Sequence, residues 1–165
     1  RQRQMCIRDS LGKYEHPNGG SLTFAPSSPG HVEHRQLSNN SLNVMAGCFL
    51  ACTSGVNIKA KFGGLKAFFS GEGAFLLEAS GSGDLFFNSF GGIVKKEING
   101  EFIVDTGHVV AFDSSLNYSI TGMGNFKSTM LSGEGLVMKF KGAGTLYLQT
   151  RNVSSVASWL TPRLL

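Results

Sequence analysis

The chain contains one sequence unit twice, and this repetition constrains the fold more than any other feature. The string SGEG at 70–73 recurs at 132–135, and a Gly-x-Gly-x-Leu string at 81–85 recurs at 142–146. A repeat of this length predicts one supersecondary unit packed against a copy of itself. Upstream, five more residues recur sixty positions later: Val44, Gly47, Ala51, Ser54 and Asn57 correspond to Val104, Gly107, Ala111, Ser114 and Asn117.

A third, partial copy lies near the start of the chain. The spacing Gly-x-Leu-x-Phe at 20–24 matches that at 83–87, which is the last strand expected in a unit. The first ten residues have no apolar periodicity and no relation to the repeat, and they fit a transit peptide only weakly. We expect them to be non-native, because they resemble translated sequencing-adapter DNA.

These observations predict a fragment in which the first repeat is mostly missing. The expected organisation is a non-native or disordered segment at 1–12, a single β-repeat domain at 13–152 and a C-terminal tail at 153–165. Within the domain we expect a remnant at 19–30 and full repeats at 43–90 and 103–150.

Composition supports a globular chain and excludes some function classes. The hydrophobic content of 41%, with 13 Phe, is sufficient for a core, and 22 Gly with only 4 Pro suggest many tight turns. Of the formal charge of +4, +2 comes from the first ten residues, and the remaining +2 is too small to indicate nucleic-acid binding. The chain contains no run of 18 apolar residues, so no transmembrane helix is predicted.

Apolar and polar residues alternate at 56–62, 116–120 and 136–141, which predicts half-buried strands. Asn99-Gly100, between apolar residues, predicts a two-residue hairpin turn. The Gly-x-Gly strings at 81–83 and 142–144 are interpreted as hairpin turns, since a phosphate loop needs a helix after it. The pattern predicts an all-β sandwich, barrel or β-helix.

The tail at 153–165 differs from the rest of the chain. We expect it to form a short helix or an extended arm, with Trp159 and Leu160 docked on the body or on a neighbouring subunit.

Three strings resemble the mitochondrial-biogenesis "altered inheritance of mitochondria" family. They are VDTGHVVAF at 104–112, SGEGLVMKFKGAGTLYLQTRN at 132–152 and LTFAPSSPG at 22–30, and the resemblance covers about residues 19–161. It implies three β-repeats with pseudo-threefold symmetry, in a short double-stranded β-helix or barrel-like assembly similar to the tryptophan RNA-binding attenuator. It also implies a mitochondrial location for eukaryotic relatives and a cytoplasmic one for prokaryotic relatives. Loss of a repeat would leave an unpaired edge and an uncovered apolar face.

Asp105 and His108 are the candidate binding or catalytic pair. In the string DTGH, the carboxylate would orient the imidazole as a general base. Their counterparts in the preceding unit are Met45 and Cys48, and no nucleophile motif accompanies them. We therefore predict no catalytic residue, interpret His108 as a structural or surface histidine, and keep an Asp105/His108 cleft as the alternative.

Glu72 and Glu134 are interpreted as corner residues that hydrogen-bond backbone N–H groups, rather than as an acid–base pair. Glycines on either side of each glutamate indicate a bulge or a tight corner. The structural motif comprises Gly71, Glu72, Gly73, Gly133, Glu134 and Gly135.

No metal site or cofactor is predicted. His31 and His34 flank a loop rich in Pro, Ser and Gly, but they lack the His-x-His spacing of metal-binding β-barrels. Cys48 and Cys52 lie four residues apart, without the further ligands that zinc requires, so we interpret both as buried free thiols.

The sequence favours a non-enzymatic scaffold or binding protein that forms a homo-oligomer, with unknown protein partners. One alternative is an enzyme or small-molecule binder that uses the Asp105/His108 cleft. A second is a nucleic-acid binder, which only fold analogy suggests. Six lysines are interpreted as solvated strand faces: Lys59, Lys61, Lys95, Lys96, Lys139 and Lys141.

Overall fold

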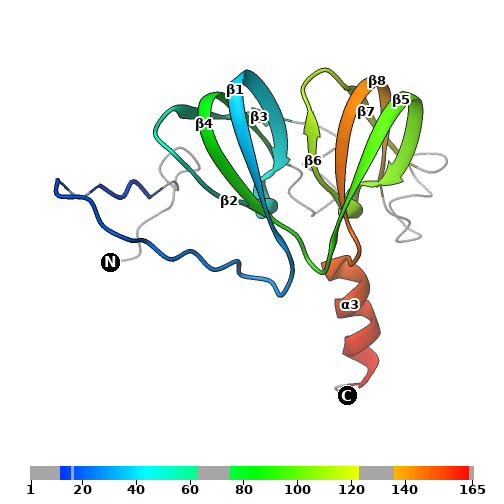
Figure 1. Ribbon diagram of the computed structural model, residues 1–165. Helices are drawn as coiled ribbons and strands as arrows, with labels where there is room; N and C mark the ends of the chain where they lie inside the picture. Colours follow the sequence, from blue (N-terminus) through cyan, green and yellow to red (C-terminus); the bar gives the residue numbers. More distant parts are fainter. Residues whose placement is uncertain (1–11, 16, 63–74, 123–135, 164–165) are drawn as a thin grey trace.

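The structure is a computed structural model that describes residues 12–15, 17–62, 75–122 and 136–163 (Figure 1). It is mostly antiparallel β-sheet, so the all-β prediction is confirmed. The first half contains β1 (Val32–Met45), β2 (Phe49–Cys52), β3 (Val56–Phe62) and β4 (Phe75–Asn88). The second half contains β5 (Ile93–Asp105), β6 (Val109–Asp113), β7 (Asn117–Gly122) and β8 (Leu136–Gln149). Two 3₁₀ turns, η2 (Ala46–Cys48) and η3 (Thr106–His108), precede β2 and β6.

The eight strands form one open sheet with the main order β2-β4-β1-β6-β8-β5. Strand β4 pairs with β1 on one side and with β3 and β2 on the other, and β8 pairs in the same way with β5, β7 and β6. Figure 1 shows β1–β4 and β5–β8 side by side. The sheet continues between them through β1 and β6, where Leu42–Val44 pair with Ala111–Asp113. The double-stranded β-helix and the pseudo-threefold arrangement stay predictions.

The alternating segments form strands as predicted. Residues 56–62 are β3, residues 117–120 lie in β7, and residues 136–141 begin β8. In β8, Met138 and Phe140 are fully buried while Lys141 is exposed. The period-two pattern therefore identified which face of this strand enters the core.

The predicted hairpin turns are wrong, because these glycines lie inside long strands. Asn99 and Gly100 lie within β5, opposite Ala143 and Gly142 of β8. Gly100 and Gly142 have φ angles of 120° and 124°. A positive φ serves a sharp strand bend as well as a turn, so the two strands bend together here instead of ending.

The Gly-x-Gly string at 81–83 likewise lies inside β4. Gly81, with a φ of 120°, pairs with Val56 at the start of β3. Further along, β4 pairs with β2 instead. A Cβ atom at Gly81 would clash with the carbonyl oxygen of Gly55, so glycine permits the close approach of the corner between β2 and β3.

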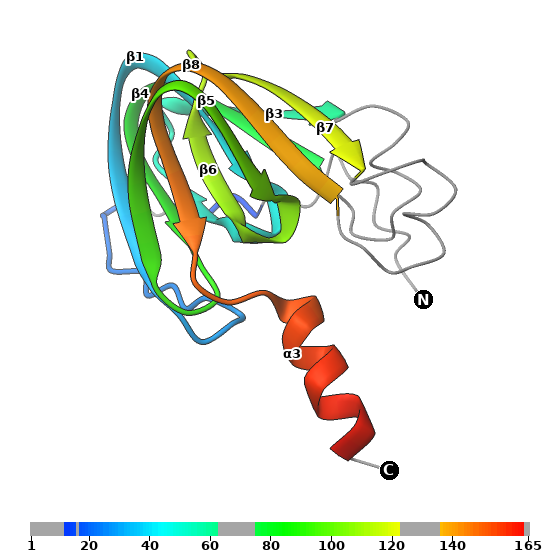
Figure 2. The same ribbon diagram turned by 90° about the vertical axis from the view of Figure 1, so that its right-hand side faces the viewer.

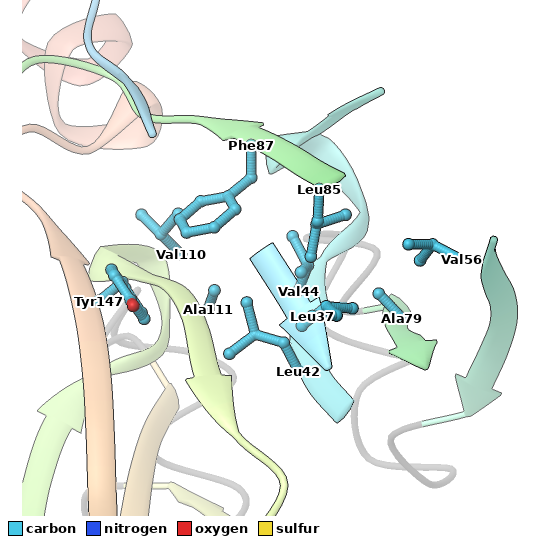
Figure 3. Close-up of a cluster of buried hydrophobic side chains, with 10 residues drawn as sticks. All are labelled: Leu37, Leu42, Val44, Val56, Ala79, Leu85, Phe87, Val110, Ala111 and Tyr147. Atoms are coloured by element: carbon cyan, nitrogen blue, oxygen red, sulfur yellow. The ribbon is translucent and has the colours of Figure 1, made fainter. Parts of the chain in front are cut away.

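The hydrophobic core consists of two clusters that both draw on the two halves. The cluster in Figure 3 combines first-half residues such as Leu42 and Phe87 with Val110, Ala111 and Tyr147 of the second half. The rings of Phe87 and Tyr147 meet edge to face, with centroids 5.1 Å apart. The second cluster surrounds Phe112 and Phe140, whose centroids are 4.9 Å apart. The core is thus continuous across the β1/β6 junction.

The two ends of the described chain are less buried than the sheet. Residues 20–24, which match the last strand of a unit, form no strand here, and Leu22 and Phe24 are exposed. A strand needs a neighbour for its ladder, and the corresponding Leu85 and Phe87 have neighbours on both sides.

The tail forms helix α3 (Val153–Leu160) followed by the 3₁₀ turn η4 (Thr161–Arg163). Figure 2 shows α3 projecting away from the sheet, and Trp159 is exposed rather than docked on the body. Among the described residues, none of the helices has the length and apolar character needed to span a membrane. The glycine–glutamate motif at 71–73 and 133–135, together with residues 1–10, lies outside the described residues.

Candidate functional site

Asp105 begins the 3₁₀ turn η3. Its Oδ1 atom accepts a hydrogen bond from the backbone N–H of Gly107 at 2.7 Å, which is the geometry of a helix N-cap. Its counterpart Met45, before η2, makes no side-chain cap bond. The carboxylate is exposed and bonded to its own backbone, so it is used locally to cap the turn.

His108 is oriented by β8 and not by Asp105. Its Nδ1 atom lies 2.8 Å from the carbonyl oxygen of Gln149. A carbonyl oxygen only accepts, so Nδ1 carries the proton and neutral His108 has its lone pair on Nε2. Among the described residues, no hydrogen bond joins Asp105 to His108, although both lie at the same turn.

Gln149 is a positioning residue that the sequence analysis missed. Its Nε2 donates to the carbonyl oxygen of Gly107 at 2.7 Å, and its Oε1 accepts from the backbone N–H of Phe90 at 2.9 Å. The side chain thereby ties η3 to the connection between the halves. No local motif marks it, because it lies more than forty residues from His108 in sequence.

A shallow pocket of about 310 Å³ opens beside His108, between the end of β8 and helix α3. Trp159 lines this pocket, and the Arg163 guanidinium, which does not line it, lies 4.3 Å from the centroid of the Trp159 ring. The lining residues His108, Arg151 and Trp159 suit a small aromatic or anionic group. The lining residues are His108, Thr150, Arg151, Asn152, Ser155, Val156 and Trp159.

Comparison with known proteins places this arrangement in a family. The sequence pattern of the family described as "Mitochondrial biogenesis AIM24" matches residues 5–151. This chain belongs to the AIM24 family. The match starts inside the segment for which we predict a non-native origin, and it includes both Asp105 and His108.

Relatives of this AIM24 chain occur in streptococci. An uncharacterised protein of Streptococcus pyogenes serotype M6 is 33% identical over 144 residues, which are 86% of this chain and 58% of that protein. The crystal structure of a Streptococcus pyogenes protein is similar with a TM-score of 0.75 and 32% identity, over 86% of this chain and 63% of that one. The AIM24 chain thus spans about 60% of the length of these relatives.

The remaining metal-ligand candidates of the AIM24 chain are engaged in local contacts. His34 Nε2 lies 2.8 Å from Asp84 Oδ1, and its ring stacks on Phe86. His31 Nε2 lies 3.5 Å from Glu33 Oε2. In the described part of the chain, no three His, Cys, Asp or Glu side chains are grouped to hold a metal ion.

Cys48 and Cys52 are free thiols that lie half-buried beside the first core cluster. Burial raises the pKa of the Cys48 thiol to about 11 and also raises the pKa of Cys52. Because the thiolate is the reactive form, neither cysteine has the environment of a nucleophile.

A polar network across the two halves was not foreseen from the sequence. Arg35 of β1 donates to the Tyr147 hydroxyl at 2.6 Å, and its other terminal nitrogen lies 3.3 Å from Asp113 Oδ1. Nearby, Lys95 Nζ and Glu33 Oε1 lie 2.5 Å apart, and this contact raises the pKa of Lys95. These contacts join β1 to β5, β6 and β8, so they hold the junction together.

Proposed function

We propose that this AIM24 chain is a non-enzymatic scaffold or binding module that self-associates. The observation that carries the proposal is that the two end strands of the main sheet order have unpaired outer sides in the described part of the chain. Among the described strands, β2 and β5 end the main sheet order; Val94 and Ile103 of β5 are exposed, and the apolar residues of β2 are half-buried. Such edges are templates for pairing with another chain unless they are blocked.

Helix α3 adds a second exposed apolar surface. Val153, Val156, Trp159 and Leu160 are all exposed, and they recur at helical spacing. Exposed aromatic and aliphatic residues on a projecting element favour contact with other macromolecules over catalysis. The family description names mitochondrial biogenesis. For relatives we propose a role in mitochondrial or membrane organisation, and for this chain a cytoplasmic assembly.

The test is light scattering coupled to size exclusion, on the full chain over a wide range of concentration. Self-association predicts a mass that rises in multiples of 17.6 kDa. A mass that stays at 17.6 kDa at every concentration would contradict the proposal. The Tyr14→Ser variant is the control, because it removes an exposed aromatic residue outside the sheet and α3.

The second candidate function is binding of a small molecule in the pocket beside His108. The Arg151 guanidinium and the Trp159 ring favour an aromatic carboxylate, while the Nε2 lone pair of His108 can accept a hydrogen bond from a donor on such a ligand. Benzoate is a suitable probe, because Trp159 is the only tryptophan and reports on the pocket by its fluorescence. A saturable change in Trp159 fluorescence with benzoate, abolished by Arg151→Gln, would support this function. If the fluorescence shows no saturable change, this second function is contradicted and the scaffold proposal stands alone.

The nucleic-acid alternative receives little support from the lysines. Lys61 lies 2.7 Å from Glu78. Lys139 and Lys141 lie 2.7 Å and 2.5 Å from the two carboxylate oxygens of Glu101. With Lys95 paired to Glu33, four of the six lysines are paired with three carboxylates, whereas phosphate binding needs a continuous positive face.

A further inference from the structure

Each strand of the first half has a counterpart in the second half, with the same partners. Strand β1 pairs along β4 as β5 pairs along β8, and β2 pairs with β4 as β6 pairs with β8. Both short strands carry the same register shift, between Phe49 and Ala51 and between Val109 and Ala111. The pairing therefore makes β5 the counterpart of β1 and β6 the counterpart of β2, sixty residues apart.

The junction between the halves uses one member of each pair of counterparts. Residues Leu42–Val44 of β1 pair with Ala111–Asp113 of β6. The counterparts of these segments are 102–104 in β5 and 51–53, which comprise the last two residues of β2 and the Thr53 that follows. They lie at opposite ends of the main sheet order, unpaired on their outer sides in the described part of the chain. The molecule thus carries a counterpart of each junction strand, β5 for β1 and β2 for β6, but these two counterparts do not pair with each other.

Burial at equivalent positions shows what pairing would cover. Asn43 of β1 is 3% exposed, whereas its counterpart Ile103 is 58% exposed. The whole apolar run at 109–112 in β6 is buried, whereas the run at 49–52 in β2 is half-buried throughout. An apolar residue therefore stands on the outer side of β5 at a position that the junction covers in β1.

The edge of β2 also lacks the features that usually block association. Its sequence, FLAC, has no charge and no proline. The charged residues of β5 lie at 95–97, 101 and 105, and two of them, Lys95 and Glu101, form ion pairs within the molecule. Lys95 binds Glu33, and Glu101 binds Lys139 and Lys141. Residues 102–104, the segment that would pair, are all apolar.

We propose that β5 of one copy pairs antiparallel with β2 of a second copy, in the register of the β1/β6 junction. This inference rests on the proposed self-association and names its interface. Phe102 would lie opposite Thr53, Ile103 opposite Cys52, and Val104 opposite Ala51. A second copy is the occupant that fits, because one chain carries both edges in matching register. The contact is head-to-tail, so it adds copies until the arrangement closes or extends.

The first test uses a thiol that the chain already has. The variant Ile103→Cys places a thiol opposite Cys52 of the next copy, within the distance of directly paired strand residues. Mild oxidation should give disulfide-linked dimers and higher species on a non-reducing gel. The Cys6→Ser background avoids a further thiol, and the added change Cys52→Ala should abolish the linkage. Linkage that survives Cys52→Ala, or no linkage at all, would overturn the proposed register.

The second test separates the edge from helix α3. Ile103→Lys and Val153→Lys both change residues that are 58% exposed, so neither change disturbs the core. By light scattering, Ile103→Lys should weaken self-association about tenfold or more, because pairing would bury the new charge. Val153→Lys should leave it unchanged, and circular dichroism should show that both variants fold.

The outcomes distinguish this inference from the proposed function. If the unmodified chain associates and Ile103→Lys associates equally well, the β5/β2 interface is wrong while self-association stands. If Val153→Lys alone dissociates the assembly, the interface lies on α3. If the unmodified chain is a monomer at every concentration, both proposals fail.

Discussion

Strands β2 and β6 occupy equivalent places in the two halves but differ in their surroundings. Each follows a 3₁₀ turn, and each pairs with the end of a long strand through the same register shift. Yet the residues at 109–112 are buried and those at 49–52 are half-buried. The difference is a single neighbour, because β1 covers β6 while the outer side of β2 is unpaired in the described chain. Position in the sheet therefore determines the burial of these two strands more than their sequence does.

Ala51 and Ala111 allow the sharpest test of this comparison, because they are identical residues at equivalent positions. Ala111 is fully buried beside β1 and in contact with the first core cluster. Ala111→Lys should cost about 4 kcal/mol or more, since it overpacks the core and buries an unpaired charge. Ala51→Lys should cost only about 1 kcal/mol. Urea unfolding followed by far-UV circular dichroism measures both, and equal losses would show that the two strands do not differ in environment.

The polar contacts of the junction provide the next test. Tyr147 of β8 is the counterpart of Phe86 in β4, and its hydroxyl accepts from the half-buried Arg35. Tyr147→Phe should cost about 2 kcal/mol, because a hydrogen bond from a charged group is lost in the interior. The control is Tyr118→Phe. The Tyr118 ring packs on Phe112, but its hydroxyl has no hydrogen-bond partner among the described residues. If both changes cost the same in urea unfolding, the Arg35 bond does not stabilise the junction.

The same contrast explains which features the sequence predicts. Period-two alternation identified the buried face of β8, because the alternation follows from the pleat of a single strand. The glycines at 81–83, 99–100 and 142–144 were misinterpreted, because a positive φ is common to turns and bends. Only pairing over the full length of β5 and β8 shows that the strands continue.

The candidate site shows the corresponding limit. Asp105 and His108 are neighbours in sequence, but His108 bonds to Gln149 and Asp105 bonds to Gly107. The role of Gln149 depends on how the end of β8 meets η3, which is a tertiary contact. Likewise, internal repetition suggested equivalent units, but which copy of each strand lies at an edge depends on the arrangement of the whole sheet.

Cys48, the counterpart of His108, extends the comparison to the 3₁₀ turns before β2 and β6. Burial raises the pKa of Cys48 to about 11 from an ordinary value of 9.0, so the folded state holds the thiol proton more tightly than the unfolded state. Its contribution to stability is therefore complete below pH 9 and is lost as the pH rises toward 11, by on the order of 1 kcal/mol. Urea unfolding at several pH values measures this slope. Cys48→Ala should flatten it, and an unchanged slope would assign it to other groups.

Glu101 offers the smallest effect, at a position where the two halves carry different charges. Hydrogen bonds from Lys139 and Lys141 hold its pKa down to about 2, from an ordinary value of 4.5. A carboxylate with a lowered pKa stabilises the fold above pH 4.5 and loses that contribution as the pH falls through about 2. Because the side chain is fully exposed, we expect a clear NMR titration but only a slight change in stability. Lys139→Met should raise the pKa of Glu101.

The first half provides the matched control for Glu101. Its counterpart is Ser41, and the counterparts of the two lysines are Glu78 and Ser80. A carboxylate introduced by Ser41→Glu would meet Glu78, which is ion-paired with Lys61, and an uncharged Ser80 instead of two lysines. Its pKa should therefore lie at or above the ordinary value, since a like charge disfavours the ionised form. If this carboxylate also titrated near pH 2, the lowered pKa of Glu101 would come from the bent backbone common to both halves. The lysines would then have no part in it.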